Sequence, residues 1–154
     1  GNKNVMLHAI HDNSSTRTNI GSPHFSVVVL ADGVGDQCEV TWTIPSDFSS
    51  ITTIEFIWCS TATSGNNAYF EFFASAATGA ESLVATDTDT IAATTYADNT
   101  TNNGRVATDI SAAVNGLTLG AGHELGIGIY REGGNGSDTL DTNVSAIGVR
   151  IVYA

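Results

Sequence analysis

The feature that most constrains the fold is a strict alternation of apolar and polar residues over positions 38–44. The apolar members are Cys38, Val40, Trp42 and Ile44, and only glutamate and threonine stand between them. Successive side chains of a β-strand point to opposite sides, so a period of two is typical of a strand with one buried face. The stretch therefore predicts a strand that packs on a core and ends at Pro45.

Similar strand-like runs recur along the chain, separated by turns rich in glycine, asparagine or proline. They span residues 25–30, 51–59, 69–75, 125–130 and 146–153, and residues 2–10 suggest a short strand or an arm. Residues 12–23 are polar and predict a loop, residues 78–104 are ambiguous, and residues 111–114 suggest one helical turn. We expect an all-β fold: a single jelly-roll-like β-sandwich of seven or eight antiparallel strands over residues 25–154, preceded by an arm and loop over residues 1–24.

Composition and charge narrow the class of partner. The 154 residues suit one domain, and 16 acidic residues against five lysines and arginines give a formal net charge of -11. Such a chain repels phosphate backbones and anionic lipids, so nucleic acid is not an expected partner. No run of 18 apolar residues is present, which argues against membrane insertion.

The stretch 51–59 is apolar on both of its predicted faces. Ile54, Phe56 and Trp58 would point to one side, and Ile57 and Cys59 to the other. A strand that is apolar on both sides is covered on both sides, for instance by a partner subunit. Cys59 and Cys38 read as small buried residues, and a disulfide between neighbouring strands is the open alternative.

The aromatic residues have two interpretations. They could fill the space between two sheets, or they could line a face on which sugar rings stack. Trp42 alternates in register with apolar neighbours and is expected inside. Tyr69 and Tyr96 stand beside polar loops and are the better candidates for exposed stacking.

Two acidic loops are candidate calcium sites, because hard cations prefer several carboxylate and carbonyl oxygens. Their residues are Asp87 and Asp89 in one loop, and Asp138 and Asp141 in the other. The alternative is that these side chains hydrogen-bond to nearby backbone, as acidic residues in glycine-rich turns often do. His8, His11 and Asp12 have the spacing of a metal motif, but on an extended chain the two imidazoles point to opposite faces. No other cofactor is expected.

Catalytic motifs are missing from the sequence. It contains no G-x-S-x-G, and nothing ties a serine to a histidine and a carboxylate. Residues 33–35 read Gly-Val-Gly but lack the following helix of a phosphate loop. We therefore expect a protein that is not an enzyme.

Three segments together resemble a known group of domains. They read "VLADG" (29–33), "IPSDFSSIT" (44–52) and "NGLTLGAGHELGIGIYREGGNGSDTLDTNVSAIGVRIVYA" (115–154). In order, they are similar to jelly-roll-like virion structural proteins of tailed phages and environmental viruses, of the capsid-decoration or head-fibre type. His123 stands where the pattern more usually has aspartate.

The resemblance implies a non-enzymatic virion structural protein that self-associates, commonly as a trimer, and docks on other capsid proteins at the virion surface. An extracellular carbohydrate-binding module with glycan partners is the alternative, and a subunit of a cell-surface filament or surface layer is a third. Measuring the size of the protein in solution separates the first two hypotheses.

Overall fold

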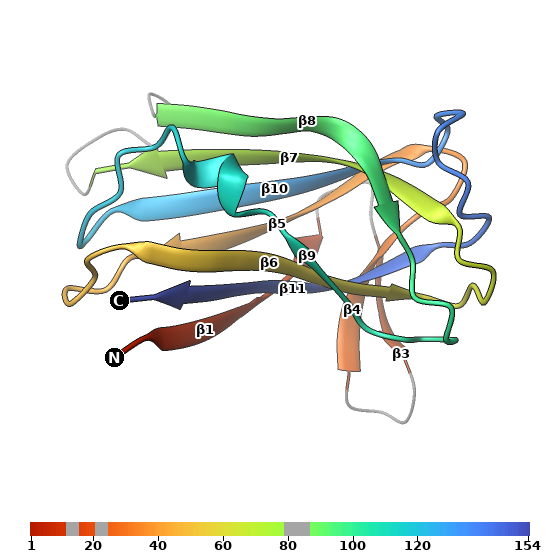
Figure 1. Cartoon of the computed structure of the whole chain (residues 1–154), viewed down its shortest axis with the longest axis horizontal. Coiled ribbons are helices and arrows are strands. Elements are labelled where there is room, and N and C mark those ends of the chain that lie inside the picture. The colour runs from red at the N-terminus through yellow and green to blue at the C-terminus, as the bar shows by residue number, and fades with distance from the viewer. Residues whose placement is uncertain (12–15, 21–24, 79–86) are drawn as a thin grey trace.

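The computed structural model describes residues 1–11, 16–20, 25–78 and 87–154 (Figure 1). Nearly all regular structure in these ranges is β-strand. The elements are β1 (Lys3–His8), β2 (Ile10–His11), β3 (Thr16–Ile20), β4 (Phe25–Leu30), β5 (Gly35–Thr43), β6 (Ile51–Ser60), β7 (Asn67–Ala77), β8 (Asp87–Ala97), β9 (Val106–Asp109), the 3₁₀ helix η1 (Ser111–Val114), β10 (Glu124–Glu132) and β11 (Val144–Tyr153).

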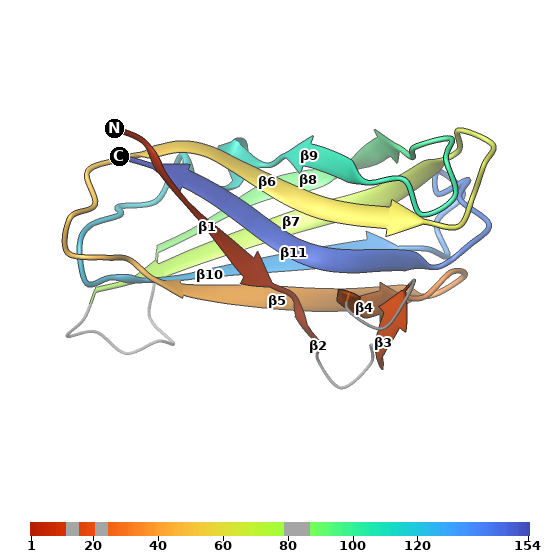
Figure 2. The ribbon, with the colours of Figure 1, turned by 90° about the horizontal axis from the view of Figure 1, so that it is seen from below.

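The strands form two antiparallel sheets that pack face to face (Figures 1 and 2). The sheet around β11 has the order β3-β4-β11-β6-β9, with β1 also paired to β11; we call it the β11 sheet. The other, the β10 sheet, has the order β2-β5-β10-β7-β8. From β4 to β7 and again from β9 to β11, the chain alternates between the two sheets. The predicted all-β, jelly-roll-like sandwich is confirmed, with eleven strands in the described ranges against the expected seven or eight.

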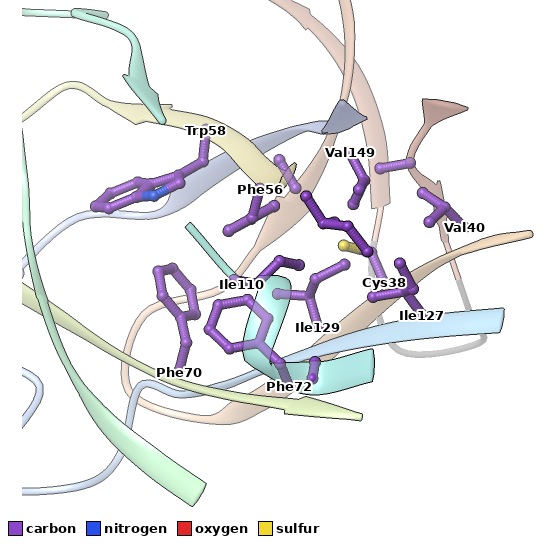
Figure 3. Packing of buried hydrophobic residues seen from close by; sticks show 14 of the residues in the cluster. Cys38, Val40, Phe56, Trp58, Phe70, Phe72, Ile110, Ile127, Ile129 and Val149 are labelled. Atoms are coloured by element: carbon purple, nitrogen blue, oxygen red, sulfur yellow. The ribbon is translucent and has the colours of Figure 1, made fainter. Parts of the chain in front are cut away.

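The core lies between the sheets and is dominated by aromatic side chains from β6 and β7 (Figure 3). The Phe56 and Phe70 rings meet edge to face with centroids 5.4 Å apart, and Trp58 packs on Phe70 at 5.3 Å. Trp42 is 7% exposed, so its expected inward orientation is confirmed. Phe48, in the turn after Pro45, packs against Trp42 with centroids 6.0 Å apart.

The expected two-sided burial of β6 is observed, but it needs no partner subunit. Ile57 is 4% exposed and Cys59 is also buried within the single chain, on the side away from the core. A register shift between Ala146 and Gly148 places an extra residue of β11 opposite this part of β6. The strand therefore gives no argument for self-association.

Neither cysteine is in a disulfide. Cys38 lies in β5 and Cys59 in β6, which belong to different sheets, and both side chains are buried thiols. Burial, with the nearby charge of Asp98, raises the pKa of the Cys59 thiol. The interpretation as small buried residues is confirmed.

The N-terminal residues take part in both sheets. β1 pairs with β11 in the register Lys3↔Tyr153 to His8↔Gly148, which places the two ends of the chain side by side (Figure 1). Part of the expected loop 12–23 is instead the strand β3, paired with β4. Asp12 lies outside the described residues.

The ambiguous middle of the chain contains the long strand β8, which pairs with β7 and closes one edge of the β10 sheet. The single helical turn expected over residues 111–114 is confirmed as η1. No helix in the described ranges is long and apolar enough to cross a membrane.

Candidate functional site

The outer face of the β10 sheet carries a recess. Strand register places outward-facing residues of successive strands in rows across the sheet. One row runs Ile10, Glu39, Gly128, Phe73 and Thr90, from β2 to β8. The next contains Thr41, Gly126, Ser75 and Thr88. Each row therefore has a glycine at its centre.

The two glycines leave a lane without side chains along the middle strand of the sheet. β10 alternates inward Leu125, Ile127 and Ile129, all buried, with outward Gly126 and Gly128. A Cβ at residue 128 would lie 3.8 Å from the Phe73 side chain, and one at residue 126 would lie 3.3 Å from the Ser75 hydroxyl. Side chains of β7 therefore border the lane on one side.

The lane is a groove with walls and ends. Glu39 and Thr41 of β5 form one wall, and Phe73 and Ser75 of β7 form the other, around a volume of about 350 Å³. An adjoining recess of about 510 Å³ continues toward Glu124 and Ala77. Glu124 and Tyr130, at the two ends of the lane, are six residue steps apart on β10, or about 20 Å at the usual rise per strand residue. We call this feature the β10 groove.

Phe73 supplies an exposed aromatic surface at the centre of the wall. Its side chain is 40% exposed, whereas Phe70 and Phe72 on the same strand point into the core and are fully buried. At the end of the groove, the Tyr130 phenol occupies the space that a side chain at residue 35 would need, so Gly35 lets this ring lie over β5. The groove thus combines one open aromatic ring with hydroxyls and carboxylates.

Hydroxyl groups and one ordered carboxylate define the polar part of the site. The Thr43 hydroxyl donates to the Glu124 carboxylate at 2.8 Å, which orients that carboxylate at the end of the groove. Thr41, Ser75, Thr88 and Thr90 contribute outward hydroxyls along the walls. Such a constellation can bind a neutral polar ligand by hydrogen bonds at the sides and apolar contact on Phe73.

Of the two tyrosines expected to be exposed, one points outward and the other points into the core. Tyr69 lies in β7 on the same outer face and is half-buried, in register with Thr95. Tyr96 instead points inward, where its ring contacts Phe72 with centroids 5.5 Å apart, and burial raises the pKa of its hydroxyl. The expectation for Tyr96 was wrong because the register of β8 puts it opposite the inward Ala68.

The first pair of calcium candidates hydrogen-bonds to the backbone of a neighbouring loop. Asp89 accepts from the Gly116 N–H at 2.7 Å, and Asp87 accepts from the Thr118 N–H at 3.3 Å. These bonds tie the segment after η1 to β8. They match the alternative weighed from the sequence, in which the carboxylates stabilise backbone.

The second pair is divided between an internal ion pair and the surface. Asp138 has a fully buried side chain that accepts from Arg131 Nε and a terminal nitrogen, both at 2.9 Å. It also accepts from the Tyr69 and Leu140 N–H groups, so each carboxylate oxygen has two donors. Asp141 is exposed.

The Arg131 guanidinium supplies the positive charge at this end of the sandwich. It donates to the carbonyl oxygens of Leu30, Leu140 and Thr142, at 3.2, 2.8 and 2.9 Å, as well as to Asp138. No group of three or more histidine, cysteine, aspartate or glutamate side chains suited to a metal occurs in the ranges that the structure describes. Calcium binding at the four aspartates stays a prediction.

The sequence of β10 contains a signal for the groove. In "LGIGIY" the outward positions of the strand are glycines, which is unusual because glycine weakens a strand interior. Glycine in a strand often marks a close approach by a ligand or another backbone. Only the register with Glu39 and Phe73 shows that these glycines form the floor of a groove.

No protein-family model matches this chain, and no curated protein matches its sequence. Among solved structures, it is similar to the family 11 carbohydrate-binding module of a cellulosomal cellulase from Clostridium thermocellum, at 10% identity and a TM-score of 0.47, over 100% of this chain and 87% of that one. A carbohydrate-binding module in complex with β-1,4-galactotriose matches at 9% identity and a TM-score of 0.40, over 98% and 86% of the two chains.

An exo-β-1,3-galactanase from Phanerochaete chrysosporium, solved with galactose, matches at 13% identity and a TM-score of 0.46. The match covers 98% of this chain but 29% of the galactanase. At these TM-scores and identities the superpositions are too loose to transfer a function.

Proposed function

We propose that this protein is a non-catalytic glycan-binding module that holds a polysaccharide chain in the β10 groove. The observation that carries the proposal is the exposed Phe73 ring beside the glycine-floored lane. A sugar ring has an apolar face of C–H groups and an edge of hydroxyls. It therefore matches a site with one aromatic platform and hydroxyl or carboxylate walls, the usual composition of a small-ligand site. An extracellular or surface location suits this role.

The positions of the acidic residues argue for binding over hydrolysis. Register places Glu39 opposite Gly128, four residues along β10 from Glu124. Asp89 also lines the recess, but its carboxylate accepts from the Gly116 N–H. The backbone positions of the two glutamates are therefore offset by about 13 Å along the strand, a wider spacing than the roughly 5–9.5 Å between the paired carboxyl groups of glycosidases. Both groups are thus better placed to bind sugar hydroxyls than to cleave a bond.

The proposal is tested by two substitutions that alter the groove without touching the core. Phe73→Ala removes the aromatic platform, and Gly128→Val fills the floor at a position whose backbone is not in the left-handed region. Each is expected to weaken glycan binding at least about tenfold, a loss of roughly 1.4 kcal/mol. The measurement is affinity electrophoresis followed by calorimetry on glucans, galactans, mannans, xylans and arabinans.

Met6→Ala is the matched control for Phe73→Ala. Met6 is 36% exposed, close to the 40% of Phe73, but it lies on the outer face of the β11 sheet. It should leave binding unchanged. Equal effects of the two substitutions, or no binding to any of the five glycan classes, would overturn the proposal.

A virion structural role with trimerisation stays a prediction from the sequence resemblance. The main physical argument for self-association was that β6 is apolar on both faces, but both faces of β6 are buried within one chain. Light scattering provides the test: a stable trimer without glycan affinity would favour the virion role, and a monomer that binds glycans favours the groove.

A further inference from the structure

We propose that the β10 groove selects uncharged glycans and rejects those that carry carboxylate or sulfate groups. This inference rests on the proposed glycan binding and adds the chemical class of the ligand. It comes from two observations that are independent of Phe73: the sign of the charges on the outer face of the β10 sheet, and the hydrogen-bonding capacity of the side chains around the groove.

The charges on this face are all negative. Glu39 lines the wall and Glu124 lies at one end, while Glu71 lies opposite Tyr130 at the other end. Glu132 is the next outward position of β10, in register with Gly35. The strands β2, β5, β7, β8 and β10 contain one lysine or arginine in total, Arg131, and its side chain is buried on the inner side.

The other cations lie on other elements. Arg150 is paired with Glu55, its register partner in the β11 sheet, and Lys3 of β1 is paired with Asp47. Arg105 precedes β9, and Arg17 lies in β3; both strands belong to the β11 sheet. A polyanionic chain in the groove would therefore meet carboxylates without any compensating cation. The negative groups of such a ligand and the carboxylates of the groove repel one another, and the repulsion is stronger at low ionic strength.

Hydrogen bonding points the same way. The polar side chains around the groove are carboxylates, which only accept when ionised, and hydroxyls of Thr41, Ser75, Thr88 and Thr90, which accept or donate. Sugar hydroxyls donate as well as accept, so they can satisfy the carboxylates of Glu39 and Glu124. A ligand carboxylate or sulfate only accepts, so one that faces Glu39 or Glu124 gives that glutamate no donor, which is costly once water is excluded.

The test compares each neutral polysaccharide that binds with its own carboxymethylated and sulfated derivatives. The wild-type protein should bind the neutral form at least about tenfold more tightly than either derivative at low salt, and the ratio should shrink as salt is added. Glu39→Gln/Glu124→Gln should reduce the ratio, because it removes two charges and introduces amide donors.

The matched control removes two carboxylates from the opposite face. Glu55 and Asp109 are register partners in the β11 sheet, and Glu55→Gln/Asp109→Asn also removes two negative charges but does not touch the groove. This control should keep the wild-type ratio. If it reduces the ratio as much as the groove variant does, overall charge and not the groove is responsible, and the inference is wrong.

The outcomes separate the two proposals. Charged derivatives that bind as tightly as the neutral chain, with both weakened by Phe73→Ala, would overturn the charge selectivity and leave glycan binding in place. Absence of binding to every neutral glycan would overturn both.

Discussion

Both sheets of this sandwich are built from strands that alternate inward and outward residues. The outer face of the β11 sheet is closed by side chains that fill its centre, whereas the outer face of the β10 sheet has a groove there. In the β11 sheet, the outward centre is filled by the Arg150–Glu55 pair and by the buried Ile57. In the β10 sheet, the corresponding central positions are Gly126 and Gly128, and a groove runs over them. The size of a few outward side chains on a middle strand therefore decides whether a sheet face is merely solvated or can receive a ligand.

The glycines are tolerated because the rest of β10 is strongly held. β10 pairs with β5 from Glu124 to Glu132 and with β7 from Glu124 to Arg131, so both of its edges are hydrogen-bonded. Each glycine in a strand costs about 0.5–1 kcal/mol relative to alanine. The inward leucine and isoleucines, and Arg131 at the end of the strand, offset that cost (Figure 3 shows Ile127 and Ile129).

The largest effect is expected from the inner side of the groove strand. Arg131→Met leaves the buried Asp138 carboxylate without its cation, and the free energy of unfolding should fall by roughly 3–5 kcal/mol. Urea denaturation measures this loss. Arg131→Met/Asp138→Leu removes both charges and should recover part of it. A single substitution that costs less than about 1 kcal/mol would show that the ion pair does not anchor the groove strand.

The closed face should depend on Ile57. Ile57→Ala removes a buried side chain and is expected to lower the free energy of unfolding by roughly 2–5 kcal/mol while leaving glycan affinity intact. Phe73→Ala should do the reverse, with a change in stability below about 1 kcal/mol because the ring is largely exposed. If Ile57→Ala were neutral, the outer face of the β11 sheet would not be closed in the isolated chain, and a partner subunit would again be required.

The smallest effect belongs to the ion pair at the centre of the closed face. Arg150 is 42% exposed, and solvent screens its attraction to Glu55. Arg150→Met should therefore change the free energy of unfolding by less than about 1 kcal/mol, and salt should reduce even that change. The same denaturation series at low and high salt measures it; a loss as large as that of Arg131→Met would place Arg150 among the anchoring residues of the fold.

The sequence predicts strands correctly where apolar and polar residues alternate strictly. It does not predict the strand whose residues are mostly polar. Positions 38–44, the turn at 111–114 and the inward Trp42 follow from local pattern and residue type. Thr16–Ile20 has little apolar character and therefore predicts a loop, but its backbone pairs with β4 and forms the strand β3. Tyr96 was misplaced because the register of β8 cannot be read from neighbouring residues.

The candidate site was less predictable than the fold. The sequence shows Asp138 as an acidic residue in a glycine-rich loop. Its partner, Arg131, is identified only from the structure, in which the loop folds back over the end of β10. Phe73 resembled its neighbours Phe70 and Phe72, and only the strand parity set by pairing with β10 turns it outward. The sequence gives the type of side chain at each of these positions, but it does not give the direction in which the side chain points.

By itself, the sequence determined the class of fold, because a period of two fits a sheet and no helix, and it determined an acidic surface poor in cations. The tertiary structure decided which faces are open. The glycine at position 128 indicates no groove by itself. It becomes the floor of one because strand pairing places Glu39 on one side of it and Phe73 on the other. Cross-strand neighbours are distant in sequence, and the empty space between them exists only once three strands are paired.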